Sequence, residues 1–307
     1  KGRAEDFVVR EVMHLEMNKK GGYVYYLLKK KDWASFEAFE EISRKSWIRV
    51  GEIGFAGLKD KRAVTEQHIS IPRRAEKLLR KARIKDMSFE FLGYGDERIV
   101  LGMLEGNTFT IVVRDIDEKK DLHVEHVRNY FDQQRFGSKT VAVGRALVQH
   151  DFERACTLLN IRAEKNNYIA ALRKFHRRLL RFYISSYQSW MWNTVVEKIS
   201  GKIEKAPLLG YLTEFSNKSI EKEYKKVMKE ENITLEHFLM KPFPELSTEG
   251  GERTVTFLVK DFTSTWGWDE LDPRKYKCTL SFFLPKGSYA TLVVKELFPV
   301  VKDKSVS

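Results

Sequence analysis

Hydrophobic and polar residues alternate along both ends of the chain, whereas its middle has helical spacing. Alternation with a period of two predicts half-buried strands. We expect strands at 7–12, 23–28, 53–55, 68–71, 89–92, 99–103, 109–114, 254–259 and 278–284. The segment 23–28 follows Gly21 and Gly22, so it is predicted to form a hairpin with 7–12.

Apolar residues three or four positions apart predict helices with one buried face. We expect helices after Ser35 and Ser288, which are good N-caps, and a basic helix that opens at Pro72. Further helices are predicted at 121–134, 142–159, 169–200 and 219–232.

The β-rich ends and helical centre indicate an α+β fold in which one domain is inserted into another. We place the sheet domain at residues 1–140 and 252–307, and the inserted domain at 141–251. The helix at 173–198 could pack with either domain.

The composition is that of a folded, basic protein. Of 307 residues, 42% are hydrophobic, and 55 Lys and Arg against 43 Asp and Glu give a net charge of +12. Such a charge favours a polyanionic partner, most simply nucleic acid, although a basic protein can also lack one. No apolar stretch is long enough to span a membrane.

The two cysteines, Cys156 and Cys278, do not form a CxxC pair, which excludes a zinc ribbon and a disulfide scaffold. A reducing, cytoplasmic location fits this usage best. The chain begins at Lys1 rather than methionine and shows no signal peptide, so we expect a few N-terminal residues to be missing.

The densest polar cluster spans residues 57–67 between two predicted strands. Asp60 lies among Lys59, Lys61 and Arg62, which favour its ionised form. Such a carboxylate can attack or deprotonate a bound polyanion, hold the basic side chains in place, or cap a turn. The three cations are candidate RNA contacts. The cluster contains neither a Walker motif nor GxGxxG, so a nucleotide cofactor gains no support.

A second cluster, residues 129–137, combines amides, aromatic rings and a cation. Phe131 could stack on a base, Asn129 could read its edge, and Arg135 could bind a phosphate. Alternatively, the aromatic rings of this cluster could pack in the core like ordinary apolar side chains.

Arg73 and Arg74 begin a basic stretch that extends to residue 85. This stretch is either a track that binds phosphates or a solvated helix face. His123 and His126 lack the further ligands of a metal site.

Five stretches in order resemble the TruD family of RNA pseudouridine synthases: residues 5–11, 55–67, 101–110, 129–137 and 280–297. Residues 186–193 are a sixth, looser match. The pattern GxKDxxAxTxQ at 57–67 is highly specific, and the resemblance is to an archaeal-type member. The chain departs from the family pattern at Ala4, where proline is usual, and at Asp132, where glycine is usual.

The resemblance implies a pseudouridine-synthase catalytic domain with a mixed, largely antiparallel sheet, and an inserted helical α/β domain specific to the family. It places the catalytic aspartate at Asp60 and the active-site cation at Lys1, with Arg3 as the alternative. Site aromatics fall on Phe7 and Phe131, and the site amide on Asn129.

The resemblance further implies action on tRNA, usually at uridine 13 of the D-arm, or on another structured RNA. Because the isomerisation needs no redox change and no external group, we expect no cofactor, and we expect a monomer. Two other functions are possible. One is a non-catalytic RNA-binding or RNA-folding relative on the same fold. The other is a metal-dependent nuclease, for which the sequence shows no convincing ligand cluster.

Overall fold

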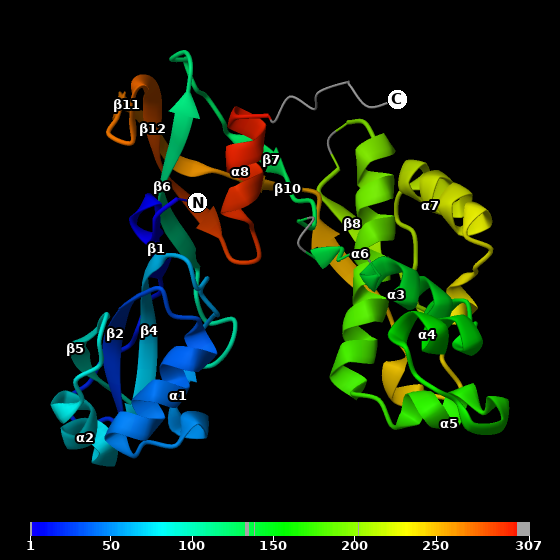
Figure 1. The fold of residues 1–307 in the computed structure, drawn as a ribbon, viewed down its shortest axis with the longest axis horizontal. Helices are drawn as coiled ribbons and strands as arrows, with labels where there is room; N and C mark the ends of the chain where they lie inside the picture. The colour runs from blue at the N-terminus through cyan, green and yellow to red at the C-terminus, as the bar shows by residue number, and fades with distance from the viewer. Residues whose placement is uncertain (1, 133–134, 138, 202, 300–307) are drawn as a thin grey trace. The chain divides into compact units, whose positions relative to one another are not determined.

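The computed structural model describes residues 2–132, 135–137, 139–201 and 203–299, and the chain divides into two compact units (Figure 1). Unit 1 contains residues 1–127 and 257–307, and unit 2 contains residues 128–256. These divisions differ from the predicted boundaries at 140/141 and 251/252. As a result, the cluster at 129–137 and the long helix of the middle region both belong to unit 2.

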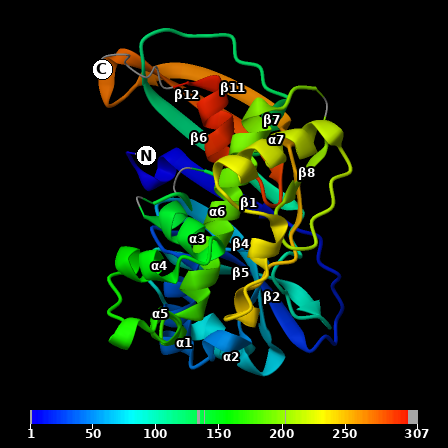
Figure 2. The same cartoon turned by 90° about the vertical axis from the view of Figure 1, so that its right-hand side faces the viewer.

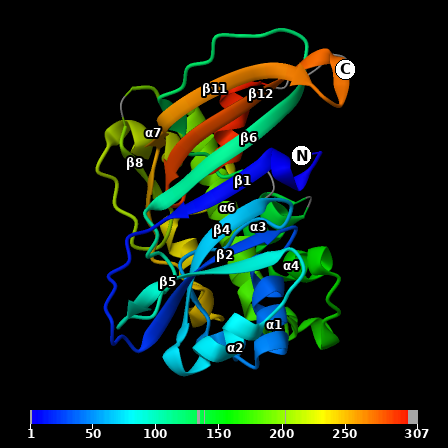
Figure 3. The ribbon, with the colours of Figure 1, turned by 90° about the vertical axis from the view of Figure 1, so that its left-hand side faces the viewer.

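Unit 1 is built on an eight-stranded sheet, in which β1 and β4 are parallel and the other pairings are antiparallel. Figure 3 shows the order β11-β12-β6-β1-β4-β2-β5, and β3 pairs with β4 off this path. The α+β class with a mixed, largely antiparallel sheet is therefore confirmed. The strands are β1 (Phe7–Val12), β2 (Tyr23–Lys31), β3 (Gly54–Phe55), β4 (Val64–Pro72), β5 (Met87–Gly95), β6 (Gly106–Ile116), β11 (Lys260–Asp269) and β12 (Asp272–Pro285).

Helices cover one face of this sheet because alternate strand residues on that face are apolar. Val24, Tyr26 and Leu28 of β2 form a core with Phe39 of α1 and Leu79 of α2. Residues of α8 line a pocket with the same face of β1 and β6. The helices are α1 (Ser35–Ser46), α2 (Glu76–Lys81) and α8 (Ala290–Leu297), and the 3-10 turns are η1 (Ala4–Asp6), η2 (Val50–Glu52) and η3 (Arg73–Ala75).

The predicted hairpin between 7–12 and 23–28 is wrong. β2 pairs with β4 and β5, whereas β1 lies between β6 and β4. The glycines before β2 do permit a turn. However, the buried faces of β1 and β2 become part of one surface only when each strand pairs with strands that are distant in sequence. Local turn signals contain no information about such long-range partners.

Several further predicted elements differ in the structure. Residues 99–103 form no strand. The helix predicted at 121–134 is absent over 121–132, and residues 133–134 lie outside the described part of the chain; β7 (His126–Arg128) lies within this segment and pairs with β10 (Thr256–Leu258). Pro72 ends β4 and directly precedes η3, so the predicted basic helix begins as a 3-10 turn and becomes α2 at Glu76. Ser35 is the first residue of α1 and not its cap, because its hydroxyl is bonded elsewhere in the fold.

Unit 2 is mainly helical and centres on α6 (Arg177–Lys198). Figure 2 shows α3 beside α6, and the two helices approach so closely that a side chain at Gly144 would meet the Tyr183 carbonyl oxygen at 2.1 Å. The other elements are α3 (Thr140–Val148), α4 (Phe152–Leu159), α5 (Tyr168–Arg173), α7 (Lys218–Glu230), β8 (Lys205–Leu208), β9 (Gly251–Thr254), η5 (Glu164–Asn166), η6 (Leu235–Phe238) and η7 (Pro244–Leu246).

The single helix predicted at 142–159 is divided in two. His150 has a left-handed backbone with φ of 60°, and the Asp151 carboxylate accepts a hydrogen bond from the Arg154 backbone N–H at 3.0 Å. Asp151 therefore caps a new helix, α4.

Candidate active site

A buried ion pair anchors the polar loop between β3 and β4. The Lys59 ammonium group lies 2.5 Å from the Glu11 carboxylate, and the two side chains are 3% and 0% exposed. The same carboxylate accepts a hydrogen bond from the His68 backbone N–H at 3.0 Å. Glu11 thus takes the place of a strand partner where the β1–β4 pairing ends, and it ties the loop to the centre of the sheet.

Two further buried side chains fix the loop backbone. The Lys59 backbone N–H donates to the Ser35 hydroxyl at 2.8 Å, and this hydroxyl donates to the Gln67 side-chain oxygen at 3.2 Å. The Gln67 amide group in turn donates to the Gly57 carbonyl oxygen at 3.5 Å. Strands β1 and β4 and helix α1 therefore all hold this loop.

This anchoring directs Asp60 outward. In the segment from Leu58 to Asp60, exposure alternates: Leu58 and Asp60 are exposed, and Lys59 between them is buried. This exposure pattern shows that Lys59 is packed into the protein while its two neighbours reach solvent. Burial of the Lys59 side chain consequently presents Asp60 to solvent on a fixed backbone, beside an apolar side chain that is 56% exposed.

Buried charges lie under the loop. Burial raises the pKa of Glu11, but hydrogen bonds from His68 and Lys59 outweigh burial and hold this pKa below its ordinary value. Lys30 on β2 donates to the Trp33 carbonyl oxygen at 2.5 Å. Burial, and secondarily the charge of Lys59, lowers the pKa of Lys30 to about 8.

The structure separates the predicted RNA-binding cations into two groups. Lys59 is buried in its ion pair, so an RNA phosphate cannot reach its ammonium group in this structure, and we assign it an anchoring role instead. The other predicted cations of unit 1 are exposed: Lys61, Arg62, Arg73 and Arg74. Lys61 lies 2.9 Å from Glu37, Arg74 pairs with Glu52, and the Arg73 guanidinium lies 4.2 Å from the Tyr94 ring centre.

Phe7 begins β1 and is buried against Phe109, with ring centres 6.0 Å apart. It also lines a pocket of about 420 Å³ with residues of β6 and α8. The preceding Asp6 is held by Arg114, whose guanidinium approaches its carboxylate at 2.7 Å and lowers its pKa. Lys1 lies outside the described residues. Arg3, the alternative cation, is 3.8 Å from Glu270.

In unit 2, Asn129 and Phe131 are brought together by Arg253. The Asn129 side-chain oxygen accepts a hydrogen bond from the Arg253 guanidinium at 2.6 Å, and this guanidinium lies 4.0 Å from the centre of the Phe131 ring. Phe131 also contacts Trp192 edge-on, with ring centres 5.7 Å apart. Arg135 lies 5.1 Å from the Phe131 ring and donates to the Ser185 hydroxyl at 3.0 Å.

Asn193 on α6 fixes the backbone of Phe131 from both sides. Its side-chain oxygen accepts from the Phe131 N–H, and its amide group donates to the Phe131 carbonyl oxygen, both at 2.9 Å. Sequence reasoning missed Asn193 and Arg253 as well as Glu11, Ser35 and Gln67. The available signal was that polar residues occur within otherwise apolar helix and strand patterns. The sequence did not reveal which residues these polar side chains contact.

Within the described residues, no group of three His, Cys, Asp or Glu side chains is placed to hold a metal ion, and no helix could span a membrane. His123 and His126 lie in a region without helix, so the helical spacing predicted for them does not occur.

The family model for tRNA pseudouridine synthase D (TruD) matches residues 1–162 and 200–297 of this chain. The chain belongs to the TruD family. It is accordingly an enzyme of the pseudouridine synthase class, and the resemblance inferred from five sequence stretches is confirmed.

Relatives within the TruD family resemble the chain over nearly its whole length. A tRNA pseudouridine synthase D from Aquifex aeolicus is 30% identical, and the alignment covers 97% of each chain. A relative from Thermococcus onnurineus is 28% identical, over 97% of this chain and 94% of its own. A crystal structure of the TruD protein from Methanosarcina mazei has a TM-score of 0.81 and 27% identity, covering 97% of this chain and 93% of that one.

Proposed function

We propose that this enzyme converts a uridine of tRNA, uridine 13 in the D-arm, into pseudouridine, with Asp60 as the catalytic carboxylate. The observation that carries the proposal is the exposed Asp60 on a loop whose neighbouring residue is anchored in the core. The family model supports the reaction class. The net charge of +12 supports an RNA substrate. Both cysteines are buried and free, which suits the cytoplasm, where tRNA is modified.

The reaction breaks the bond between N1 of uracil and C1′ of ribose, and the electron pair leaves with the base. The base then turns and forms a bond between C5 and C1′, after which C5 loses its proton and N1 gains one. The product is an isomer of the substrate, so no oxidant or external group is consumed. Asp60 can support bond breaking in two ways, both of which need its ionised form: it can attack C1′ and form an ester that C5 later displaces, or it can remove the C2′ proton and return it when C5 bonds to C1′.

The target base must leave its stack before the ribose can reach a protein carboxylate. We assign Phe131 the role of stacking on the detached uracil, and Asn129 the role of fixing Arg253 against that ring. Phe7 contributes to the apolar lining of the pocket beside α8.

The test of this function is incubation of the protein with an unmodified tRNA transcript, followed by mapping of pseudouridine through carbodiimide-dependent stops of primer extension. We expect one new stop at uridine 13 with the wild-type protein. A stop at another uridine would retain the activity and change the target. Tight RNA binding without a stop in tRNA or in total cellular RNA would favour a non-catalytic RNA-binding relative.

Replacing Phe131 by alanine should lower kcat about 10- to 100-fold while changing RNA affinity little, since a stacked ring acts on the detached base. Single-turnover rates and filter binding would separate the two effects. Phe131→Leu is the control, because it keeps apolar volume against Trp192 but lacks the flat ring. A loss of affinity with unchanged kcat would contradict this role.

Chelation distinguishes the synthase from a metal-dependent nuclease. The proposed chemistry needs only a carboxylate and base stacking, so EDTA should leave the initial rate unchanged within about twofold. The rate is measured in a buffer whose monovalent salt keeps the tRNA folded. A loss of activity that added Mg²⁺ or Zn²⁺ restores, with the tRNA fold unchanged, would argue against a metal-independent mechanism.

A further inference from the structure

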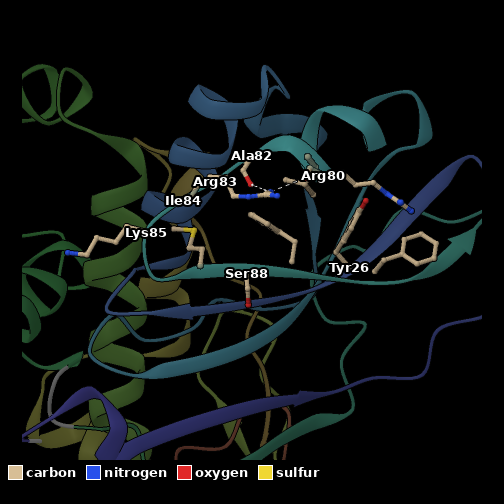
Figure 4. A pocket seen from close by; sticks show the side chains of 11 residues that line it. Tyr26, Arg80, Ala82, Arg83, Ile84, Lys85 and Ser88 are labelled. Carbon is tan, nitrogen blue, oxygen red and sulfur yellow. Dashed lines mark hydrogen bonds between the residues drawn. The ribbon is translucent and has the colours of Figure 1, made fainter.

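An open pocket of about 700 Å³ lies between the end of α2 and strand β5, which is the last strand of the sheet path in unit 1. Figure 4 shows its lining, to which Tyr26 contributes from β2, Arg80 and Arg83 from the α2 end, Lys85 from the approach to β5, and Ser88 from β5 itself. Its size is in the range of sites that hold one small ligand or one nucleotide.

The lining is strongly basic. Arg80, Arg83 and Lys85 all contribute to it, and none of its lining residues, all of which the structure describes, carries a carboxylate. Arg80 is paired with Glu76 at 2.7 Å, and Arg83 donates to the carbonyl oxygens of Arg80 and Ala82. Each guanidinium has five N–H donors, so both retain donors for an anion. The pocket therefore favours a negatively charged group.

The pocket also presents a flat aromatic surface. Phe91 is 41% exposed, which is high for a large apolar side chain in a strand. The Arg80 guanidinium lies 5.1 Å from its ring centre, and the Tyr26 ring is 5.9 Å away, edge-on. Aromatic rings next to guanidinium groups are the usual stacking platform for unpaired bases.

A buried hydroxyl adds a polar group to this surface. Tyr26 is 2% exposed, and its buried hydroxyl is approached by the Arg80 guanidinium. The contact keeps the Arg80 guanidinium at the wall of the pocket, beside the exposed ring of Phe91.

We propose that this pocket binds one unpaired nucleotide of the RNA substrate, with its phosphate on Arg80, Arg83 and Lys85 and its base on Phe91. The proposal rests on the proposed function for the identity of the polyanion as RNA. With this role, residues 80–85 of the basic stretch that begins at Arg73 form a binding surface and not a solvated helix face. A nucleotide explains the cations and the exposed ring together, whereas inorganic phosphate would explain the cations alone.

The test measures RNA affinity apart from chemistry, in full-length protein that carries Asp60→Asn. In this background, the triple change Arg80→Gln, Arg83→Gln and Lys85→Gln should weaken tRNA binding about tenfold at 0.1 M salt. The slope of log K against log salt should become shallower by about 2. Fluorescence anisotropy with labelled tRNA gives both quantities.

The matched control removes the same charge from the same unit. Arg274→Gln, Lys275→Gln and Lys277→Gln change cations of β12, which form ion pairs with Asp272, Asp117 and Glu270. This variant should bind tRNA within about threefold of its parent. Equal losses in the two triple variants would overturn the proposal, because they would show an effect of net charge alone.

Phe91→Leu tests the base contact without a change of charge. Leucine keeps an apolar side chain against Tyr26 and Tyr94, so folding should be retained, whereas affinity for tRNA should fall about fivefold. Photo-crosslinking of tRNA that contains 4-thiouridine should label the peptide spanning residues 84–91. Unchanged affinity together with the absence of that crosslink would contradict the proposal. Because these readouts are binding and crosslinking, a failure to form pseudouridine would refute the proposed function separately.

Discussion

Replacing Asp60 by asparagine is expected to abolish pseudouridine formation, with a loss of at least about 10⁴-fold in kcat, while RNA affinity stays nearly unchanged. The carboxylate is the group that attacks C1′ or removes the C2′ proton, and a neutral amide can do neither. Asparagine has almost the same size, and Ser35 and Gln67 hold the backbone that precedes position 60, so the loop should keep its conformation. Single-turnover assays on tRNA and filter binding measure the two effects.

Two further variants make this result decisive. Asp60→Ala cannot regain a carboxylate by deamidation, so it should be equally inactive. Asp261→Asn is the matched control, because Asp261 is exposed on β11 with a left-handed backbone, φ of 54°, that asparagine adopts readily. This control should retain full activity. Activity of the Asp60→Asn protein near the wild-type level would refute the proposed mechanism.

The second large effect is expected from breaking the ion pair beneath the loop. Lys59→Met leaves the Glu11 carboxylate buried without its cation, which should lower the free energy of unfolding by about 3–5 kcal/mol. Activity should fall as well, because the segment that presents Asp60 loses its anchor. Urea unfolding followed by circular dichroism measures the first effect.

The ion pair should also make stability depend on pH in a defined window. The pKa of Glu11 is lower in the folded protein than its ordinary value of 4.5. The stabilisation that Glu11 provides is therefore fully present above about pH 4.5 and is lost as the pH falls below it. The difference in stability between the wild type and Glu11→Gln should accordingly be constant near neutral pH and should shrink below pH 4.5.

Lys61→Met is the control for Lys59→Met, since it removes the same charge from the same loop. The pair between Lys61 and Glu37 is solvent-exposed, so its loss should change the free energy of unfolding by less than about 1 kcal/mol. If Lys59→Met and Lys61→Met were equally stable, the buried pair would not be the anchor that we infer.

Sequence patterns located most elements of this fold but not their partners. The alternation at 7–12 and 109–114 predicted strands that the structure contains as β1 and β6. The pattern could not reveal that these two strands are neighbours, with about a hundred residues between them. Long-range pairing depends on which buried faces complete one core, and a local period of two is the same for any partner.

In the candidate site, too, the sequence reveals the residues but not their contacts. The charged loop around Asp60 is recognisable from its residues, yet every cation in it looked equally exposed in the sequence. Only the fold places Glu11 beneath Lys59, so that one lysine becomes structural while Lys61 stays at the surface. In a similar way, the apolar spacing of α6 predicted a packed helix face, and the structure adds that Asn193 on this helix clamps Phe131.

The sequence by itself determined the α+β class, the basic character of the protein, the TruD family and Asp60 as the candidate catalytic carboxylate. These follow from residue periodicity, charge and a specific local motif, all of which are short-range properties of the chain. The tertiary structure decided the strand order, the buried ion pair, the role of Arg253 between Asn129 and Phe131, and the basic pocket beside β5. Each of these depends on burial and on distances between residues far apart in sequence, which only the packed chain defines.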